Sequence, residues 1–314
     1  MNEKTRKIIY KVLIVVFSVV FVVSAVVVGH YIVDSIQANQ QHSDIQNLHT
    51  KPTGTKPTTL PTEPTTIPTK PTEPSQPITG PTDPSVVPSV PPTEPPTEPP
   101  TEPPTEPPTV PTEPQILDEM KALYDINPDL VGWIKIEGTK IDYPVVQSLH
   151  ERNYYLYKDF YGDYAKEGSL YVREACDVFA PSDNVTIYGH NMANLSMFGQ
   201  LKYYRTRGKA FYEEHKYIQF DTLYEHHTYE IIAVFATSGT YGVGYPYHLF
   251  DDAATEEEFN EFVNAIKGGD SRVTTYYKID ATAEYGDKLI TLSTCAKNIG
   301  IEDGRFVVVA KRIS

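Results

Sequence analysis

The prolines of this 314-residue chain are concentrated in one segment. Residues 51–114 hold 23 of the 27 prolines, and from Pro91 the unit PPTE is repeated four times in succession. Proline fixes φ near −65°, and the segment has few apolar side chains with which to form a core. The sequence therefore predicts an extended polyproline-type stalk of roughly 200 Å, at about 3.1 Å per residue. Any globular fold is confined to the flanking residues.

The segment before the stalk has the properties of a membrane anchor. Val12 to Val33 contains no Asp, Glu, Lys or Arg. As a helix it would rise about 33 Å, enough to cross a hydrocarbon core of about 30 Å. The cations of the N-terminus precede it, which predicts a cytoplasmic N-terminus and an extracellular remainder. A cleaved signal peptide is the alternative, but the apolar run continues beyond the small-residue site at residues 23–25.

These features divide the chain into three parts. We expect a cytoplasmic tip and transmembrane anchor over residues 1–34, an extracellular linker with the Pro/Thr/Glu-rich stalk over residues 35–114, and one globular domain over residues 115–314. The globular part carries 20 Lys and Arg against 30 Asp and Glu, a net charge of −10. Nucleic acid and anionic lipid are therefore poor partners for it. A long stalk favours work away from the bilayer, for example within a cell wall.

Most predicted elements of the globular part are β-strands. Residues 131–146 have the pattern of a hairpin that turns at Glu137-Gly138-Thr139. Further stretches rich in Val, Ile, Thr and Tyr are residues 168–174, 184–191, 217–224, 228–238, 287–295 and 305–313. Together these give a mainly β domain of about eight strands, for which a closed or nearly closed barrel is the expected architecture.

Three short helices are predicted beside the strands. Apolar residues recur at helical spacing over residues 116–124 and again from Leu195 to Leu201. The third helix spans Thr255 to Lys267, where Thr255 and Glu258 have the spacing of a capping box. The glycines at 268 and 269 end it.

Cys295 ends a predicted strand in the sequence ITLSTCAKN and is one of only two cysteines. Two cysteines allow one disulfide at most, which an extracellular domain of this size does not need. A strand end is a position from which a rigid scaffold can present a side chain in a cleft. A buried structural cysteine is the alternative for Cys295 and is the interpretation that we favour for Cys176.

His190 is the one histidine of nine with a comparable position, because it follows the predicted strand NVTIY directly. Gly189 gives the backbone freedom before it. Arg305 opens the last predicted strand, ten residues after Cys295. If these two strands are neighbours, the guanidinium returns to the same end of the sheet as the thiol.

Together, cysteine, histidine and arginine make a set for acyl transfer, with a nucleophile, an acid/base and an oxyanion stabiliser. An ordinary ion pair of Arg305 with Glu302 or Asp303 is the alternative use of the arginine. No C-x-x-C, H-x-x-x-H or H-E-x-x-H spacing occurs, and phosphate-loop and dinucleotide glycine patterns are absent. We therefore expect neither a metal centre nor a cofactor.

Three motifs resemble the sortase family, the membrane-bound cysteine transpeptidases of Gram-positive bacteria. They are YGHNM at 188–192, TLSTC at 291–295 and GRFVV at 304–308, in that order after an N-terminal anchor. The predicted helix before the cysteine strand and the opening GWIKIEGTKIDYPVVQ resemble the class B branch. The resemblance covers nearly the whole globular part, and it implies a sortase-type closed β-barrel with residues 115–314 as the catalytic domain.

The resemblance also implies roles for individual residues. Cys295 would be the nucleophile, His190 the general acid/base and Arg305 the group that positions substrate and stabilises the oxyanion. The residues that would line the substrate pocket are Leu156, Ser293 and Thr294. The substrate would be a sorting signal such as LPxTG or NPxTN on a surface or pilin protein. The acceptor would be the amine of a peptidoglycan cross-bridge or a pilin lysine.

Two features depart from the class B pattern: Lys297 stands where an aromatic residue is common, and the PPTE stalk is unusual. A wall-spanning adhesin or binding module on a Pro-rich stalk, with an incidental cysteine, is the main alternative function. A papain-like hydrolase is another. An L,D-transpeptidase is excluded, because its histidine lies close before the cysteine, whereas 105 positions separate the two here.

Overall fold

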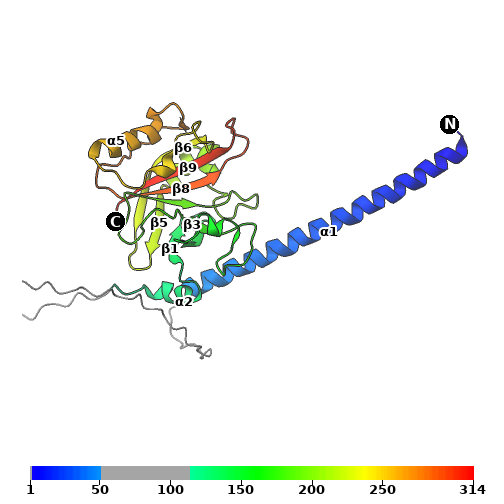
Figure 1. Ribbon diagram of the computed structural model, residues 1–314, viewed down its shortest axis with the longest axis horizontal. Helices are drawn as coiled ribbons and strands as arrows, with labels where there is room; N and C mark the ends of the chain where they lie inside the picture. Colours follow the sequence, from blue (N-terminus) through cyan, green and yellow to red (C-terminus); the bar gives the residue numbers. More distant parts are fainter. Residues whose placement is uncertain (1, 51–113) are drawn as a thin grey trace, which may run out of the picture. The chain divides into compact units, whose positions relative to one another are not determined.

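The computed structural model describes residues 2–50 and 114–314 (Figure 1). These two stretches belong to one compact unit. The stalk predicted over 51–114 lies, up to residue 113, outside the described residues.

After one long helix, the described elements are strands and short helices. In chain order they are α1 (Glu3–Thr50), α2 (Asp118–Ile126), β1 (Leu130–Lys135), β2 (Asp142–Val146), η1 (Tyr154–Tyr157), β3 (Leu170–Val172), β4 (Asn184–Tyr188), α3 (Lys202–Thr206), α4 (Lys209–Glu214), β5 (Tyr217–Thr222), β6 (Thr228–Ser238), η2 (Tyr247–Leu249), α5 (Glu256–Asn264), η3 (Ala265–Gly269), β7 (Thr274–Thr275), β8 (Leu289–Cys295) and β9 (Gly304–Arg312).

Eight of the strands close into a barrel. Neighbours pair in the order β5-β1-β2-β3-β4-β8-β9-β6, and β6 pairs with β5 to complete the circle. The β2–β3 and β4–β8 pairs are parallel, and the other pairs are antiparallel. The predicted barrel of about eight strands is thus confirmed. The two-residue β7 on the edge of β6 was not predicted, because two exposed threonines carry no strand pattern.

The described core has three clusters, and β8 lies between two of them because side chains alternate across a strand. On β8, Ile290 and Leu292 join the cluster that fills the barrel. Leu289, on the other face, joins a second cluster that packs under α5 through Phe259 and Phe262. Figure 1 shows α5 on the same side as β6 and β9, and side chains of both strands belong to this second cluster.

The helix predicted over 255–267 forms as expected. The hydroxyl of Thr255 accepts a hydrogen bond from the Glu258 amide at 3.2 Å, and the helical conformation ends at Gly268, whose φ is 101°. The helix predicted over residues 116–124 also forms, as α2, shifted by two residues.

The helix predicted from Leu195 to Leu201 does not form. Leu195 and Met197 have φ values of 71° and 53°, which a right-handed helix cannot contain. The amide of Phe198 instead donates to the carbonyl of His190, and helical residues begin only at Lys202. Phe198 and Leu201 are buried and Leu195 is partly buried in a series of turns, so their spacing does not come from a helix.

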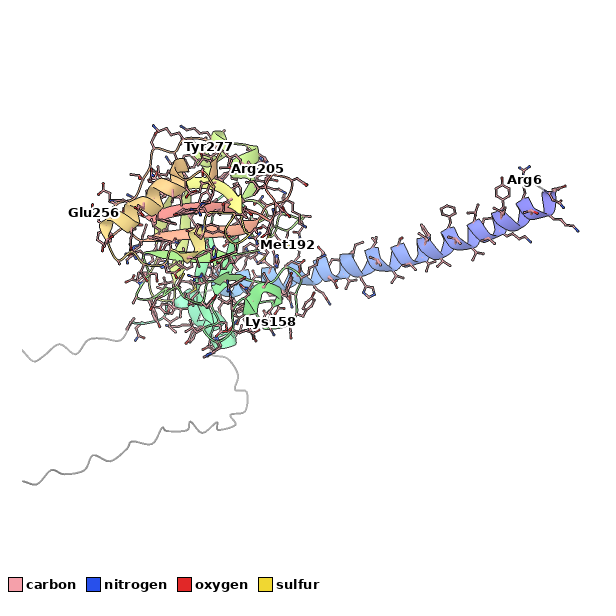
Figure 2. All side chains as sticks on the ribbon, turned by 45° about the horizontal axis from the view of Figure 1, so that its top comes forward. Arg6, Lys158, Met192, Arg205, Glu256 and Tyr277 are labelled. Carbon is pink, nitrogen blue, oxygen red and sulfur yellow. The ribbon has the colours of Figure 1, made fainter. Side chains whose placement is uncertain are left out.

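α1 is longer than the predicted anchor. It is the one helix of the described residues that is long and apolar enough to cross a membrane. The Val, Ile, Leu and Phe side chains between Val12 and Val33 are exposed, and Figure 2 shows side chains projecting outward along this half of α1. The helix then continues to Thr50. Residues 35–50, predicted as the start of a linker, are therefore helical.

Candidate active site

Two of the predicted catalytic residues lie where β8 ends and the neighbouring β9 begins, at one edge of the barrel. Cys295 is the last residue of β8, and its thiol is free and exposed. In the antiparallel register of β8 and β9 its partner is Arg305. Directly paired residues lie on the same face of a sheet, so the thiol and the guanidinium share both an edge and a face.

His190 reaches the same edge from the other neighbour of β8. β4 runs parallel to β8 with Tyr188 opposite Ser293, and the amide of Gly189 donates to the Ser293 carbonyl at 3.1 Å. One residue further on, His190 lies level with the end of β8. The side-chain amide of Asn191 donates to the carbonyl of Cys295 at 2.9 Å. The histidine loop is therefore tied to the backbone of the cysteine.

Gly189 serves a different purpose from the predicted one. It is not among the residues with positive φ, so conformational freedom is not what requires glycine. A Cβ at this position would clash with Leu170 Cδ2 and would lie 2.7 Å from Phe198 Cδ2. Close packing of these buried side chains is the physical reason for a glycine before His190.

The imidazole of His190 is held by the η1 segment. Its Nε2 lies 2.8 Å from the carbonyl oxygen of Leu156, and its ring lies 5.4 Å from that of Tyr157. Because a carbonyl oxygen only accepts, this contact requires the hydrogen on Nε2. In the neutral imidazole, Nδ1 then carries the lone pair. Leu156, predicted to contact substrate, thus also orients the histidine through its backbone.

Arg305 forms the ion pair that was the alternative use of this residue. Its Nη1 lies 2.7 Å from Asp303 Oδ1 and also donates to the Asp303 carbonyl at 3.1 Å. Burial by itself would lower the pKa of the guanidinium, but the hydrogen bond to Asp303 and the negative charges of Cys295 and Asp303 raise it. Arg305 therefore forms the ion pair with Asp303 and also lies beside Cys295. Its guanidinium remains a cation.

Ser293 and Thr294 lie on opposite faces of β8. The Ser293 hydroxyl, on the face of Cys295, lies 2.6 Å from the Tyr247 hydroxyl. Thr294 shares its face with Leu292, which fills the barrel, and its hydroxyl has no hydrogen-bond partner within the described part of the chain. The structure therefore brings Ser293, but not Thr294, to the side of the thiol.

Tyr247 and Asn191 were missed as site residues. Burial raises the pKa of the Tyr247 phenol to about 12, so it remains protonated at neutral pH. It lies in GYPYHLF, which has neither strand nor helix periodicity, and no sequence signal marks it. Asn191 stands directly after His190 within the YGHNM motif, and its position next to the histidine could have identified it as a site residue.

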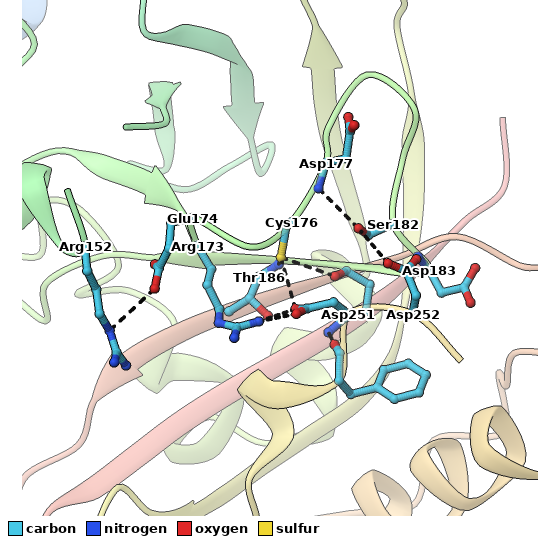
Figure 3. A network of polar contacts seen from close by, with 12 residues as sticks. Arg152, Arg173, Glu174, Cys176, Asp177, Ser182, Asp183, Thr186, Asp251 and Asp252 are labelled. Atoms are coloured by element: carbon cyan, nitrogen blue, oxygen red, sulfur yellow. Dashed lines mark hydrogen bonds and ion pairs between the residues drawn. The ribbon is translucent and has the colours of Figure 1, made fainter. Parts of the chain in front are cut away.

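Cys176 is buried, as predicted, and takes part in a polar network (Figure 3). Burial raises the pKa of its thiol to about 12, and its sulfur lies 3.3 Å from Asp251 Oδ1. Figure 3 shows Arg173 reaching the same carboxylate, with which it forms an ion pair. The network joins the end of β3 to the loop that follows η2, and so supports the segment that carries Tyr247.

No group of three or more His, Cys, Asp and Glu side chains within residues 2–50 and 114–314 is arranged to hold a metal ion. The chemistry available at this edge is that of a thiol, an imidazole and a guanidinium.

Comparisons with known proteins agree with this arrangement. The family model for the sortase domain matches residues 134–313. Sortase B of Listeria monocytogenes is 30% identical over 200 residues, which are 64% of this chain and 76% of the relative. A Staphylococcus aureus sortase B–substrate complex has a TM-score of 0.55 at 28% identity, covering 64% of this chain and 87% of that one. A sortase B complexed with triglycine has the same TM-score and identity, covering 64% and 88%.

Proposed function

Since the chain belongs to the sortase family and is therefore a cysteine transpeptidase, we propose that it cleaves a C-terminal sorting signal of the LPxTG or NPxTN type and transfers the protein to an amine. Two observations on its relatives support this: one sortase B structure holds a substrate and another holds triglycine, which offers a primary amine. The acceptor would accordingly be a peptidoglycan cross-bridge or the lysine of a pilin.

We assign Cys295 as the nucleophile, His190 as the general acid/base and Arg305 as the oxyanion and positioning group. The observation that carries this assignment is the pairing of Cys295 with Arg305 across β8 and β9, together with the Asn191 hydrogen bond that ties the His190 loop to the cysteine carbonyl. The three functional groups thus come from three adjacent strand ends that a rigid barrel holds.

In the first half-reaction, the thiolate of Cys295 attacks the carbonyl carbon of the sorting-signal threonine. The carbonyl π electrons move to oxygen, and the guanidinium of Arg305 stabilises that charge. The carbon–nitrogen bond then breaks while the imidazolium of His190 gives its proton to the leaving amine. The products are a thioester and the C-terminal fragment.

In the second half-reaction, the acceptor amine attacks the thioester. Neutral His190 takes the proton of the amine, a new amide bond forms and the carbon–sulfur bond breaks, which restores the thiolate. Because Arg305 is also bonded to Asp303, its guanidinium is held in place before substrate arrives, and little reorganisation is needed at the moment of reaction.

For substrate binding we propose Leu156 and Ser293 as neighbours of the threonine side of the signal. Leu156 contacts His190, and Ser293 precedes Cys295 by two residues on the same face. Thr294, predicted for the same role, would act indirectly, because its side chain shares the face that fills the barrel.

The enzyme would be anchored by Val12–Val33, with its N-terminus in the cytoplasm and the barrel outside. The exposed apolar side chains of this half of α1 support a lipid environment, and the cations that precede it support the orientation.

A panel of sorting-signal peptides with varied amines tests the function. We expect cleavage of a threonine-containing signal, and added amine should divert the product to the transpeptidated form. A peptide with a thiol-reactive group should label the wild type, whereas Cys295→Ala should remain unlabelled. Equal labelling of both proteins would refute the nucleophile. Cleavage that ignores amine would indicate a hydrolase, and no reaction with any signal would favour a non-catalytic binding module.

A further inference from the structure

The last turns of α1 contact the barrel through one face of the helix. The His42 ring stacks on Tyr143 with centroids 4.3 Å apart, and the His49 ring stacks on Trp133 at 4.0 Å with an interplanar angle of 8°. Between them, Ile45 is only 6% exposed.

A hydrogen bond fixes the position of the helix along the hairpin. The side-chain amide of Gln46 donates to the carbonyl of Asp142 on β2 at 3.2 Å. Positions 42, 45, 46 and 49 have the i, i+3, i+4, i+7 spacing of a single helix face. We call the four side chains His42, Ile45, Gln46 and His49 the docking face.

The docking face comes before the Pro-rich segment in the chain. α1 runs without interruption from Glu3 to Thr50, and His42 follows Val33 by nine positions, or about 14 Å of helix. Residues 51–113 therefore begin after the helix has already met the barrel. Pro114, where the described chain resumes, leads directly into α2, and the Leu117 amide bonds to the Leu223 carbonyl of the barrel at 2.8 Å.

We propose that the docking face holds the barrel beside the membrane anchor, so that the catalytic site works near the membrane surface and the Pro-rich segment does not set its height. This inference rests on the proposed membrane span over Val12–Val33. It replaces the expectation of a long spacer between the anchor and the barrel. A substrate still attached to the membrane would then meet the active site without leaving the bilayer surface.

Cleavage of the chain after the docking face tests the proposal. A recognition sequence for a site-specific protease is placed within residues 51–113 of the full-length protein in lipid vesicles, and the vesicles are sedimented after cutting. We expect the barrel fragment to sediment with the anchor fragment. Release of most of the wild-type barrel into the supernatant would overturn the proposal.

Two variants make this experiment specific. Ile45→Asp places a carboxylate in the contact, where it cannot be solvated, so the barrel should be released after cutting. Asn47→Asp introduces the same group at an exposed position on the same helix and should behave as the wild type. If the anchor fragment itself leaves the vesicles, the membrane span is wrong. Co-elution of the two fragments in detergent then tests the docking face alone, and neither readout depends on transpeptidation.

The only tryptophan of the chain supplies a second measurement in the uncut protein. Trp133 is 2% exposed beneath His49. We expect Ile45→Asp to shift its emission to longer wavelength and to increase its quenching by acrylamide, whereas Asn47→Asp should change neither. A wild-type Trp133 that is as accessible to acrylamide as that of Ile45→Asp would contradict docking.

Discussion

At the scale of single residues, the site depends on small side chains that leave room for the functional ones. A Cβ at Gly239 would lie 2.6 Å from the guanidinium carbon of Arg305 and 2.7 Å from Asp303 Oδ2. The glycine therefore allows the arginine and its aspartate to occupy their places beside β8. No sequence pattern pointed to this position.

We predict that Gly239→Ala displaces Arg305 while the barrel stays folded. Because a displacement of about 1 Å can cost on the order of 10²-fold in rate, kcat/KM for a sorting peptide should fall by roughly that factor. The melting temperature should change little, because the atoms that must move end a long side chain. In an Arg305→Ala background the same substitution should have no further effect on kcat/KM, and an additive loss would show that the glycine acts elsewhere.

Lys297 is a second residue whose effect is local. It is exposed, two positions after Cys295. We predict that it favours sorting signals with an acidic residue at the variable position, and that Lys297→Tyr lowers kcat/KM for these signals roughly two- to fivefold, the range of an exposed ion pair. Signals with a neutral residue there serve as the comparison, and Lys278→Tyr, at another exposed position, serves as the control variant. An equal effect on both kinds of signal would refute this role.

At the scale of elements, polar contacts attach the loop between η2 and α5 to the barrel. The carboxylate of Asp251 bonds Arg173 after β3 and also contacts the Cys176 thiol. Its neighbour Asp252 accepts from the Asp183 amide before β4 at 2.9 Å. The loop between η2 and α5 is thus attached to the barrel at both residues.

We predict that Asp251→Ala destabilises the domain by roughly 2–3 kcal/mol in denaturant unfolding. Breaking a buried ion pair costs about 3–5 kcal/mol, and less is expected here because the two side chains are 15% and 19% exposed. Asp280→Ala removes a carboxylate from an exposed pair with Lys278 and should cost less than about 1 kcal/mol. Similar losses in the two variants would mean that the network of Figure 3 contributes little.

At the scale of the whole molecule, docking of α1 should depend on pH. Burial lowers the pKa of both His42 and His49 from 6.5. The negative charge of Asp142 raises the pKa of each histidine, but by less than burial lowers it. Glu119 and Asp221 also raise the pKa of His49, and His226 lowers it. The undocked histidines therefore bind protons more readily than the docked ones. Docking is strongest above about pH 6.5 and weakens as the pH falls from there towards the lowered pKa values.

Acrylamide quenching of Trp133 between pH 8 and pH 5 measures this dependence in the full-length protein. We expect quenching to increase below about pH 6.5 in the wild type. In a variant with His42→Gln and His49→Gln, quenching should stay constant across the same window. A wild-type profile without this increase would show that protonation of the two histidines does not oppose docking.

Much of the fold could be predicted because its signals are local. Alternation and β-branched runs indicated all eight barrel strands, and the Thr255 cap indicated α5, since each pattern is complete within a few neighbouring residues. The helix predicted from Leu195 was wrong for the same reason: its apolar spacing is local, but the backbone of Leu195 and Met197 is left-handed, and the Met197 amide donates to the hydroxyl of Tyr143, 54 positions away.

The sequence by itself determined the strands, the apolar stretch of the N-terminal helix, and the cysteine, histidine and arginine that the proposed chemistry uses. Only the tertiary structure decided which strand ends meet, because the parallel pairing of β4 with β8 joins residues about a hundred positions apart. It also decided that Thr294 faces the inside, that Tyr247 bonds Ser293 and that residues 35–50 are helical and dock on the barrel. These outcomes depend on contacts between segments distant in the chain, and a local pattern carries no information on such contacts.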